Sequence, residues 1–470
     1  MKLSIKSSFF ILLSVGLSAV LANASEKPNI IIILADDLGY NDISPTPFGA
    51  GEAHDIKTPH LEALADQGTV LTSFYVSSVC TPTRASLMTG CNPVRVGMPG
   101  VLLNDTKGLH PDEITIAEKL KEQGYVTGMV GKWHLGKPDS MLPTAQGFDR
   151  WYGNITSNNL KTDVSAYAFT QDTTLLEGIT AEDLANGVKV RAPILRGQTG
   201  SKLKIVEAPG DQEQLSINFA KESVAFIREN KDKPFFLYLA FTAPHDPLYP
   251  SKEWQGSSPR GNKFGDVVQE MDWGIGQVLS ELESQGISEN TLVIFTSDNG
   301  AHKNWGGSNA PFLGNKGTVL EGGVRVPFIA RWSGKIAAGA QNDTPSHIID
   351  LFPTIVNLTG GSIPDDRIID GRDIWPVLSG DPNAPVAHET IYIYRVSRQR
   401  AIRQGKWKYH AAYPQENLGE RLFDLSASDL EDDGANVIQQ YPELAKKLAE
   451  QLAAHSEKLR KNRRPAGVEK

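Results

Sequence analysis

A cysteine, a proline and an arginine stand at alternate positions, Cys80, Pro82 and Arg84, in a tract that closes with Thr89-Gly90. Pro82 suits the first turn of a helix, where the N–H that proline lacks has no partner within the helix. Cys80 is therefore predicted to lie at or just before a helix N-terminus, with Arg84 one turn later. Because unpaired backbone N–H groups point outward at such an end, the tract predicts an anion-binding site beside Cys80.

The chain has one other cysteine, Cys91. A disulfide between Cys80 and Cys91, or a pair of buried structural thiols, is the simplest alternative to a chemical role. A bridge requires neither Pro82 nor Arg84, so the tract favours the chemical role. A Cys80–Cys91 bridge in an oxidising compartment would remove the thiol on which that role depends.

Oxygen donors follow two apolar segments of the chain. Asp36 and Asp37 come directly after one such segment, and Asp298 and Asn299 come directly after another. Each pair alone is better explained by turn or helix-cap chemistry. Two pairs at the ends of two predicted buried strands favour a hard divalent cation, Ca²⁺ or Mg²⁺. The donors are all oxygens and the Cys and His spacing does not suggest zinc.

Two lysines and two histidines supply positive charge and protons: Lys132, His134, His245 and Lys316. Hydrolysis of an anionic ester needs both, because charge on the ester must be neutralised and the leaving oxygen must be protonated. The alternatives are structural. His245 could shape the turn that begins at Pro244, and Lys316 could be an ordinary lysine of a surface loop.

The elements that must position these residues can be predicted from hydrophobic patterning. Four apolar, β-branched or aromatic segments run straight into the polar residues above, as buried strands do when they end in functional loops. Segments with helical spacing lie between them, ending near Gly124, before Pro234 and at Gly286. Strand alternating with helix predicts an α/β fold with a large, mainly parallel sheet covered by helices on both faces. The polar residues should then converge at the carboxyl ends of the strands. The four predicted strands are 29–35, 125–131, 234–241 and 291–297.

The chain is long enough, at 470 residues, for more than one domain. We predict a catalytic α/β domain over 25–380, with residues 156–210 as an insertion or long loop region near the crevice. A small C-terminal α+β domain over 381–470 is predicted from short antiparallel strands near 391–394, 403–409 and 422–425 and from a helix over 442–459.

Residues 1–24 have the pattern of a signal peptide: Lys2 and Lys6 precede an apolar run, and Ala22-Asn23-Ala24 offers small residues for cleavage. A membrane anchor that is retained is the alternative, although the run is short and contains serines. We therefore expect a periplasmic or secreted protein. Cleavage removes two lysines and changes the formal charge from −8 to −8 − 2 = −10. Such an acidic chain is not expected to bind nucleic acid.

These motifs occur together in one known family. The tract at Cys80 resembles the C-x-P-x-R maturation signature of the type I sulfatases, residues 127–136 are similar to the second signature, and residues 295–300 are similar to the metal-binding segment. The resemblance covers nearly the whole mature chain. It implies an arylsulfatase-like sulfuric ester hydrolase with the alkaline phosphatase-like α/β fold. Cys91 departs from the family pattern, because relatives often carry a basic residue there.

The resemblance also implies a role for each matched residue. A formylglycine-generating or other sulfatase-maturing enzyme would convert Cys80 to formylglycine, whose hydrate attacks sulfur and forms a covalent sulfo-enzyme intermediate. Arg84 would hold this group, Lys132 and Lys316 would contact sulfate, and His134 would take a proton from the second hydroxyl. His245 with Lys316 would protonate the leaving alcohol. The implied Ca²⁺ ligands are Asp36, Asp37, Asp298, Asn299 and the oxidised Cys80.

The expected substrate is a sulfated carbohydrate outside the cell, either a marine galactan such as carrageenan or a glycosaminoglycan. His302, Asn304 and Trp305 lie just beyond the second metal segment and are candidates for a sugar subsite. Trp133 and Trp151 could line it too, or pack in the core. Two other functions stay open: a phosphodiester or phosphonate monoester hydrolase of the same superfamily, and an unmodified protein that binds sulfated glycans.

Overall fold

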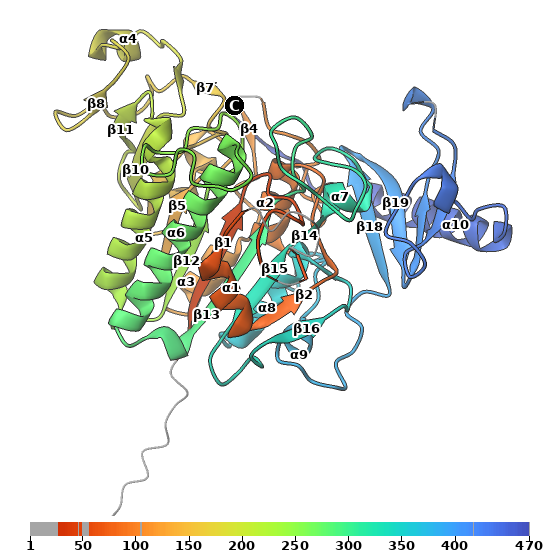
Figure 1. Cartoon of the computed structure of the whole chain (residues 1–470). Coiled ribbons are helices and arrows are strands. Elements are labelled where there is room, and N and C mark those ends of the chain that lie inside the picture. Colours follow the sequence, from red (N-terminus) through yellow and green to blue (C-terminus); the bar gives the residue numbers. More distant parts are fainter. Residues whose placement is uncertain (1–26, 46, 49–55, 104–105, 417, 470) are drawn as a thin grey trace, which may run out of the picture.

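The four apolar segments form the centre of one 11-stranded sheet in the computed structural model, which describes residues 27–45, 47–48, 56–103, 106–416 and 418–469 (Figure 1). The predicted signal peptide lies outside the described residues. The central strands are parallel neighbours in the order β13 (Thr291–Ser297), β1 (Asn29–Ala35), β12 (Phe235–Ala240) and β5 (Val126–Gly131). Their carboxyl ends therefore meet at one edge of the sheet.

Shorter strands extend the sheet on both sides. Beside β13 lie β15 (Phe328–Arg331), β2 (Thr69–Leu71) and β16 (Ala340–Asn342), of which β15 runs antiparallel to both β13 and β2. Beside β5 lie β6 (Arg150–Gly153), β10 (Ile194–Gln198), β11 (Lys204–Ala208) and β8 (Thr174–Leu175). Residues 156–210, predicted as an insertion or loop region, thus contribute three strands to the main sheet.

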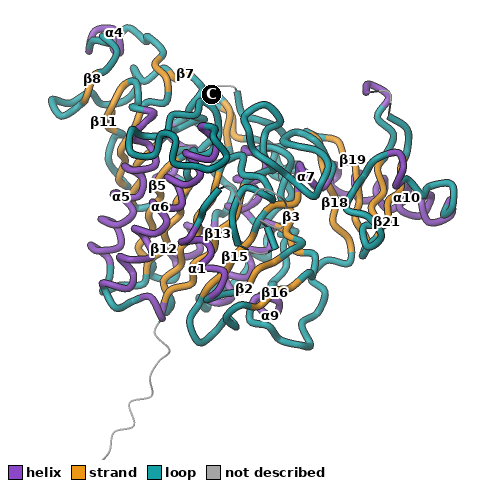
Figure 2. Tube along the Cα trace, in the orientation of Figure 1, coloured by secondary structure: helices purple, strands orange, loops and turns teal. Residues whose placement is uncertain are grey.

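Helices cover the two faces of the sheet (Figures 1 and 2). The side chains of Ile31 and Ile33 pack in one apolar cluster with α1 (Pro59–Asp66), α5 (Leu215–Asn230) and α6 (Lys263–Ser284). Ile30 and Ile32 point to the other face and pack with α2 (Cys80–Thr89), α3 (Ile116–Glu122) and α8 (Leu351–Leu358). Successive residues of a strand face opposite sides, so a fully apolar strand is what this three-layer arrangement requires. The predicted α/β fold class is confirmed.

A second, antiparallel sheet lies towards the C-terminus. It contains β18 (Thr390–Arg395), β19 (Arg398–Gln404), β20 (Trp407–His410) and β21 (Arg421–Asp424), and α10 (Pro442–Lys461) packs on it through an apolar cluster. The single strand predicted near 403–409 is wrong. Gly405, with φ of 56°, forms a turn there, and the segment is divided between β19 and β20.

Buried charges join this second sheet to the larger part of the fold. Lys408 on β20 has its ammonium 2.8 Å from the Glu321 carboxylate of α7 (Glu321–Val324) and 2.9 Å from Glu431. Tyr75 donates to the other oxygen of Glu321 at 2.6 Å. The C-terminal strand β22 (Gly467–Val468) pairs with β4 (Lys107–Gly108), so the end of the chain returns to the larger part of the fold.

The smaller elements complete the connections. Among the described helices, none is both long and apolar enough to cross a membrane. The remaining strands and α-helices are β3 (Phe74–Tyr75), β7 (Lys161–Thr162), β9 (Val190–Arg191), β14 (Arg325–Val326), β17 (Ser346–His347), α4 (Ala181–Ala185) and α9 (Trp375–Leu378).

Candidate active site

Cys80 is the first residue of α2 and lies at the carboxyl edge of the main sheet. Val79 before it is extended, and Gly90 ends the helix in the left-handed conformation with φ of 65°. Every side chain of α2 is buried, which fixes the direction of the helix N-terminus. The predicted position of Cys80 at a helix N-terminus is confirmed. Burial raises the pKa of its thiol.

The two cysteines lie at opposite ends of α2 and both are free thiols. A ten-residue helix is about 15 Å long, much more than the spacing of two bridged cysteines. Cys91 instead contacts the carbonyl oxygens of Thr89 at 3.3 Å and Ile368 at 3.4 Å. The alternative of a Cys80–Cys91 disulfide is therefore wrong.

His134 is placed to act on residue 80. Its Nδ1 lies 3.4 Å from the sulfur of Cys80, and its Nε2 lies 3.2 Å from the carbonyl oxygen of Leu102. A carbonyl can only accept, so Nε2 carries the proton and Nδ1 presents a lone pair to residue 80. Burial, together with the charges of Lys132 and Arg84, holds the pKa of His134 well below its usual value. The neutral imidazole can therefore accept a proton from a group on residue 80.

Arg84 joins α2 to the ends of two strands. Its guanidinium donates to Asp298 Oδ2 from Nε at 3.1 Å and from Nη2 at 2.9 Å, and to the carbonyl oxygen of Lys132 at 2.8 Å. Nη2 is also 3.6 Å from Asp36. All these side chains are fully buried, so the guanidinium is the charge that allows two carboxylates to lie together at this edge.

Lys132, Ser157 and His245 form a short chain of polar contacts. The Lys132 ammonium lies 2.5 Å from Asp36 Oδ2 and donates to Ser157 Oγ at 3.2 Å. Ser157 Oγ lies 3.4 Å from His245 Nε2. His245 Nδ1 donates to the carbonyl oxygen of Asp246 at 2.6 Å, which leaves Nε2 to face the site. Because Nδ1 already carries a proton, His245 can pass a proton from Nε2 to a leaving group here only as the imidazolium ion.

Lys316 reaches the site from the loop between β13 and α7. Its ammonium lies 2.7 Å from Asp37 Oδ1 and 2.8 Å from Oδ2, and the Asn299 amide donates to Asp37 Oδ1 at 2.7 Å. The backbone of the loop is held as well, because Gly317 N donates to the carbonyl oxygen of Ser78 at 2.7 Å. Lys316, whose side chain is 13% exposed, is therefore a partly buried site residue and not an ordinary surface lysine.

Two site residues have backbone conformations that side chains rarely adopt. Asp37, two residues after β1, has φ of 67°, and His134, three residues after β5, has φ of 58°. Non-glycine residues in this left-handed region are uncommon and strained. The surrounding hydrogen bonds hold both residues in the conformation that turns their side chains towards Cys80 and the acidic cluster.

The acidic residues have the donor chemistry of a cation site. The carboxylate and imidazole atoms of Asp36, Asp37 and His245 that could bind a metal ion lie within 4.8 Å of one another. Asp37 N also donates a hydrogen bond to Asp298 Oδ1 at 3.1 Å. Among the described residues, Asp36 Oδ1 and Asn299 Oδ1 are buried and have no hydrogen-bond partner. Burial of a polar oxygen without a partner is costly, and a cation would satisfy both. The donors present fit a divalent metal ion.

Electrostatics favour the same interpretation. Burial opposes ionisation of Asp36, but the positive charges of Lys132, His245 and Arg84 prevail and lower its pKa. Burial and the negative charge of Asp36 raise the pKa of Asp298. A bound cation would relieve the repulsion between these two carboxylates.

The candidate sugar residues do not join this cluster. Trp305 is 40% exposed, and its ring lies 5.9 Å from that of His302 on the segment after Asn299. Asn304 is exposed beside them, so a subsite at these residues stays a prediction. Trp133 and Trp151 are buried, and each indole N–H donates to a backbone carbonyl. These two tryptophans therefore pack in the core.

Sequence reasoning missed Ser157. It lies in the segment after β6, where the polar, weakly periodic sequence gave no pattern that would distinguish it from its neighbours. Only the fold brings its hydroxyl between the side chains of Lys132 and His245.

We expect Ser157→Ala to lower kcat by about tenfold, because the hydroxyl aligns Lys132 with His245, and loss of one such contact costs about 1–2 kcal/mol. The free energy of unfolding should change by less than about 1 kcal/mol. Steady-state kinetics with an anionic ester and urea unfolding measure the two quantities. Unchanged kcat would show that the contact has no part in turnover, and Ser157→Thr, which keeps the hydroxyl, serves as the control.

Comparisons with known proteins agree with this site. A sequence model described as Sulfatase matches residues 28–362, and one described as N-sulphoglucosamine sulphohydrolase, C-terminal, matches residues 313–458. The chain is 35% identical to steryl-sulfatase of Rattus norvegicus, over 83% of this chain and 76% of that protein. It is 36% identical to N-acetylgalactosamine-6-sulfatase of Canis lupus familiaris, over 85% and 74% of the two chains. The solved structure of Ps i-CgsB in complex with k-i-k-neocarrahexaose is similar at a TM-score of 0.77 and 29% identity, over 92% and 93% of the two chains.

Proposed function

The chain belongs to the sulfatase family and is a sulfuric ester hydrolase, and on this premise we propose that it is an exported, formylglycine-dependent enzyme that removes sulfate from a carbohydrate. The observation that carries the proposal is the position of Cys80. It is a buried residue at a helix N-terminus, next to the free Nδ1 of His134 and within the cluster of Arg84 and the oxygen donors.

Conversion of Cys80 to formylglycine requires a maturing enzyme as a partner. The hydrated aldehyde would supply a hydroxyl that attacks sulfur and a second hydroxyl whose deprotonation releases sulfate, which an alcohol side chain cannot do. The neutral His134 is suited to take that second proton at Nδ1, since its Nε2 proton is held by the Leu102 carbonyl. Arg84 holds the start of α2 against the two strand ends and so orients residue 80.

The remaining cations are suited to bind the sulfate group. Lys132 is buried and Lys316 is partly buried, and Asp36 and Asp37 hold them, so they present fixed positive charge without reorganising when substrate binds. Burial opposes the charge on Lys316, but Asp37 prevails and raises its pKa, which keeps the ammonium protonated. His245 Nε2 lies 3.4 Å from Ser157 Oγ and 3.8 Å from Asp37, so it is placed to donate the proton that the leaving alcohol needs.

We assign Ca²⁺ to the acidic cluster, with Asp36, Asp37, Asp298, Asn299 and the oxidised residue 80 as ligands. When bound, the ion would polarise a sulfate oxygen and stabilise negative charge on residue 80. An oxygen-only donor set favours Ca²⁺ or Mg²⁺ over softer metals, and the unpartnered oxygens of Asp36 and Asn299 support it.

Removing the metal should lower the melting temperature by several degrees, because three carboxylates then lie close together without the cation. Differential scanning fluorimetry with EDTA, and then with CaCl₂ or MgCl₂ in excess, measures the change. Ca²⁺ should restore stability at lower concentration than Mg²⁺. Asp37→Asn is the matched variant and should respond weakly to either treatment. A wild-type melting temperature that changes neither with EDTA nor with either ion would contradict the metal assignment.

A sulfated galactan is the substrate class we favour. The bound neocarrahexaose in the structure of Ps i-CgsB supports a carbohydrate substrate of this kind. The curated relatives carry the names of a steryl-sulfatase and an N-acetylgalactosamine-6-sulfatase, so family membership alone leaves the alcohol part of the substrate open. The exposed Trp305 beside His302, on the segment that follows Asn299, would suit a sugar ring.

Export is proposed from the sequence of residues 1–24. N-terminal sequencing of the protein recovered from periplasm or medium should begin near residue 25. Recovery of the intact N-terminus in the membrane fraction would instead support a retained anchor.

The test of function is release of sulfate from a panel of defined compounds by matured protein. Sulfated carrageenan oligosaccharides should be the best substrates, with glycosaminoglycan fragments next and an aryl phosphodiester or phosphonate monoester at least about a hundredfold slower in kcat/KM. A faster phosphonate reaction would favour the superfamily alternative. Tight binding of the sulfated oligosaccharides without turnover, by protein whose Cys80 is unmodified, would favour a glycan-binding protein.

A further inference from the structure

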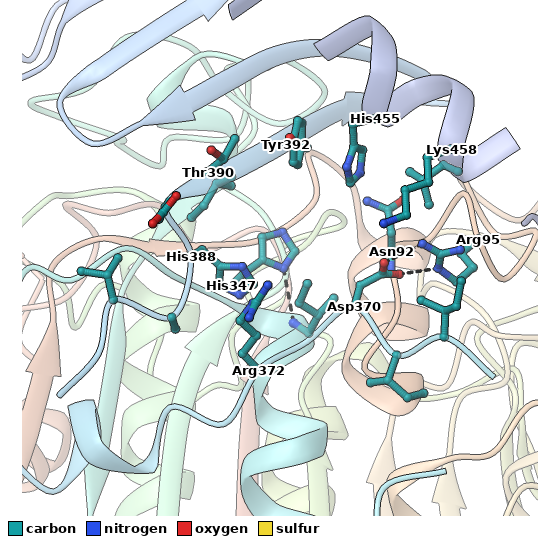
Figure 3. A pocket seen from close by; sticks show the side chains of 18 residues that line it. Asn92, Arg95, His347, Asp370, Arg372, His388, Thr390, Tyr392, His455 and Lys458 are labelled. Carbon is teal, nitrogen blue, oxygen red and sulfur yellow. Dashed lines mark hydrogen bonds and ion pairs between the residues drawn. The ribbon is translucent and has the colours of Figure 1, made fainter. Parts of the chain in front are cut away.

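A second pocket, with a volume of about 640 Å³, lies far from Cys80. It begins beyond the C-terminal end of α2, at Asn92 and Arg95, whereas Cys80 stands at the N-terminal end, about 15 Å away along the helix. One wall comes from the catalytic part of the fold, through His347 and Arg372. The other comes from β18 and from α10, which supplies His455 and Lys458 (Figure 3). The pocket is therefore distinct from the candidate active site.

The pocket contains two positive charges that the described residues leave without a partner. Figure 3 shows Arg372 rising from one wall and Lys458 reaching in from α10 on the other. The side chains of both are exposed, and within the described part of the chain neither makes a side-chain hydrogen bond or ion pair. The third cation, Arg95, is not free, because its guanidinium donates two hydrogen bonds of 2.7 Å to the Asp370 carboxylate. Arg372 and Lys458 are therefore the groups free to bind a ligand.

The acids near the pocket are mostly engaged. Asp370 is neutralised by Arg95, as described above. Asp350 is fully buried behind the wall and accepts from His388 at 2.6 Å and from the backbone N–H of Arg372 at 2.9 Å. Glu389 is exposed on the lining and carries the remaining negative charge. The two free cations thus exceed the free carboxylate, and the lining favours an anion.

The histidine on the inner wall adds a hydrogen-bond donor. His347 Nδ1 accepts from the backbone N–H of Ile349 at 3.3 Å, so in the neutral imidazole the proton lies on Nε2. Within the described residues, Nε2 donates to no other group, and Figure 3 shows the ring at the pocket. Donors from Arg372, Lys458 and His347 match an oxyanion, which offers acceptors in several directions.

The remaining lining suits a sugar. Ile368 and Val386 are 40% and 58% exposed, and the rings of Tyr392 and His455 stack with centroids 3.6 Å apart. Such surfaces pack against the apolar faces of a sugar ring. The volume lies in the range of small-molecule sites and is far larger than one sulfate ion, for which a space of a few waters would suffice.

We propose that this pocket is a non-catalytic binding site for a sulfated sugar unit, with Arg372, Lys458 and His347 as the donors to its sulfate and hydroxyl oxygens. The choice of a sulfated sugar as the carrier of the oxyanion rests on the proposed function. The site would hold a second stretch of a sulfated glycan, or a released fragment, on the side of the molecule between the two sheets.

The test is calorimetric titration of Cys80→Ala protein, which cannot turn the ligand over, with a sulfated carrageenan oligosaccharide. We expect two binding sites per chain. The added double change R372Q/K458Q should remove one site, or weaken it at least about tenfold, and leave the other unchanged. The control K461Q/R463Q makes the same change in net charge on exposed residues at the end of α10 that do not line the pocket, and it should retain both sites.

Further titrations distinguish a sulfated sugar from free sulfate as the ligand. The desulfated oligosaccharide should bind only weakly, and raising the salt concentration should weaken binding of the sulfated one. A sulfated oligosaccharide that binds only at a site unaffected by R372Q/K458Q, or equal binding of the desulfated sugar, would overturn the proposal. Binding of inorganic sulfate without binding of the sulfated sugar would also overturn it, in favour of a free-anion site.

A failure here is separable from a failure of the proposed function. In matured protein that does not carry the Cys80→Ala change, R372Q/K458Q should keep the wild-type kcat on a small aryl sulfate. Loss of the second binding site with normal hydrolysis supports the pocket and the activity together. Absence of hydrolysis in the wild-type protein, with the second site still present, would contradict the proposed function alone.

Discussion

Cys80→Ala should abolish hydrolysis of sulfate esters, with a fall in kcat of at least about a thousandfold. The proposed nucleophile is made from this side chain, and an alanine offers no group to attack sulfur. The change removes one sulfur from a buried position whose neighbours are held by the contacts of Arg84, so the protein should remain folded. Sulfate release under single-turnover and steady-state conditions measures the effect.

Cys91→Ser is the matched control. Cys91 lies at the other end of α2, and a serine hydroxyl can keep the contacts to Thr89 and Ile368. Its kcat should stay within about twofold of wild type. Equal loss of activity in both variants would mean that the cysteines act through folding, and substantial activity in Cys80→Ala would remove residue 80 from the chemistry.

Arg84→Met should lower stability and activity together. The change leaves the buried Asp298 carboxylate without two hydrogen bonds and removes the positive charge beside Asp36, and breaking a buried ion pair from one side costs about 3–5 kcal/mol. Activity should fall by about a hundredfold or more, since residue 80 and the metal ligands lose their common support. Urea unfolding and kcat/KM in saturating Ca²⁺ measure the two effects.

Arg84→Lys separates charge from geometry. It keeps a positive charge in the cluster but cannot reach Asp298 and the Lys132 carbonyl at once, because it lacks the planar fork of arginine. We expect a smaller loss of stability than in Arg84→Met and a similar loss of activity. A free energy of unfolding for Arg84→Met within about 1 kcal/mol of wild type would contradict the role given to this buried pair.

It was predictable that the site residues would meet, because the central strands of the main sheet are parallel. Asp36, Lys132, His245 and Asp298 each follow an apolar segment, and those segments became four adjacent parallel strands. Parallel strands place their carboxyl ends together, so residues far apart in the sequence meet without any knowledge of their contacts. Helical spacing likewise indicated α5, α6 and α10, because each buries one continuous apolar face.

Other features could not be predicted from the same patterns. Ser157 lies in a polar segment with no periodicity, and its place between Lys132 and His245 depends on how β6 leaves the sheet. Strands β8, β10 and β11 are short and partly exposed, so their sequence resembles that of a loop. The turn at Gly405 was missed because aromatic and basic residues on either side continue a strand-like pattern.

The second pocket was also beyond sequence reasoning. Its lining comes from segments near residues 92, 347, 370, 390 and 455, which are brought together where β18 and α10 pack against the larger part of the fold and not by a motif. Lys458 belongs to the basic run 458–464, whose composition alone is typical of a solvated helix end. The fold places Lys458 on the pocket, while Lys461 pairs with Glu457 on the same helix.

The central claim concerns the chemical state of residue 80, and peptide mass spectrometry across Cys80 tests it most directly. The protein should be expressed with its export signal and a sulfatase-maturing enzyme. Our account expects a peptide in which one sulfur and two hydrogens are replaced by one oxygen, absent from Cys80→Ala and unchanged in Cys91→Ser. A peptide that retains the thiol under these conditions, in protein that still hydrolyses sulfate esters, would contradict the formylglycine mechanism.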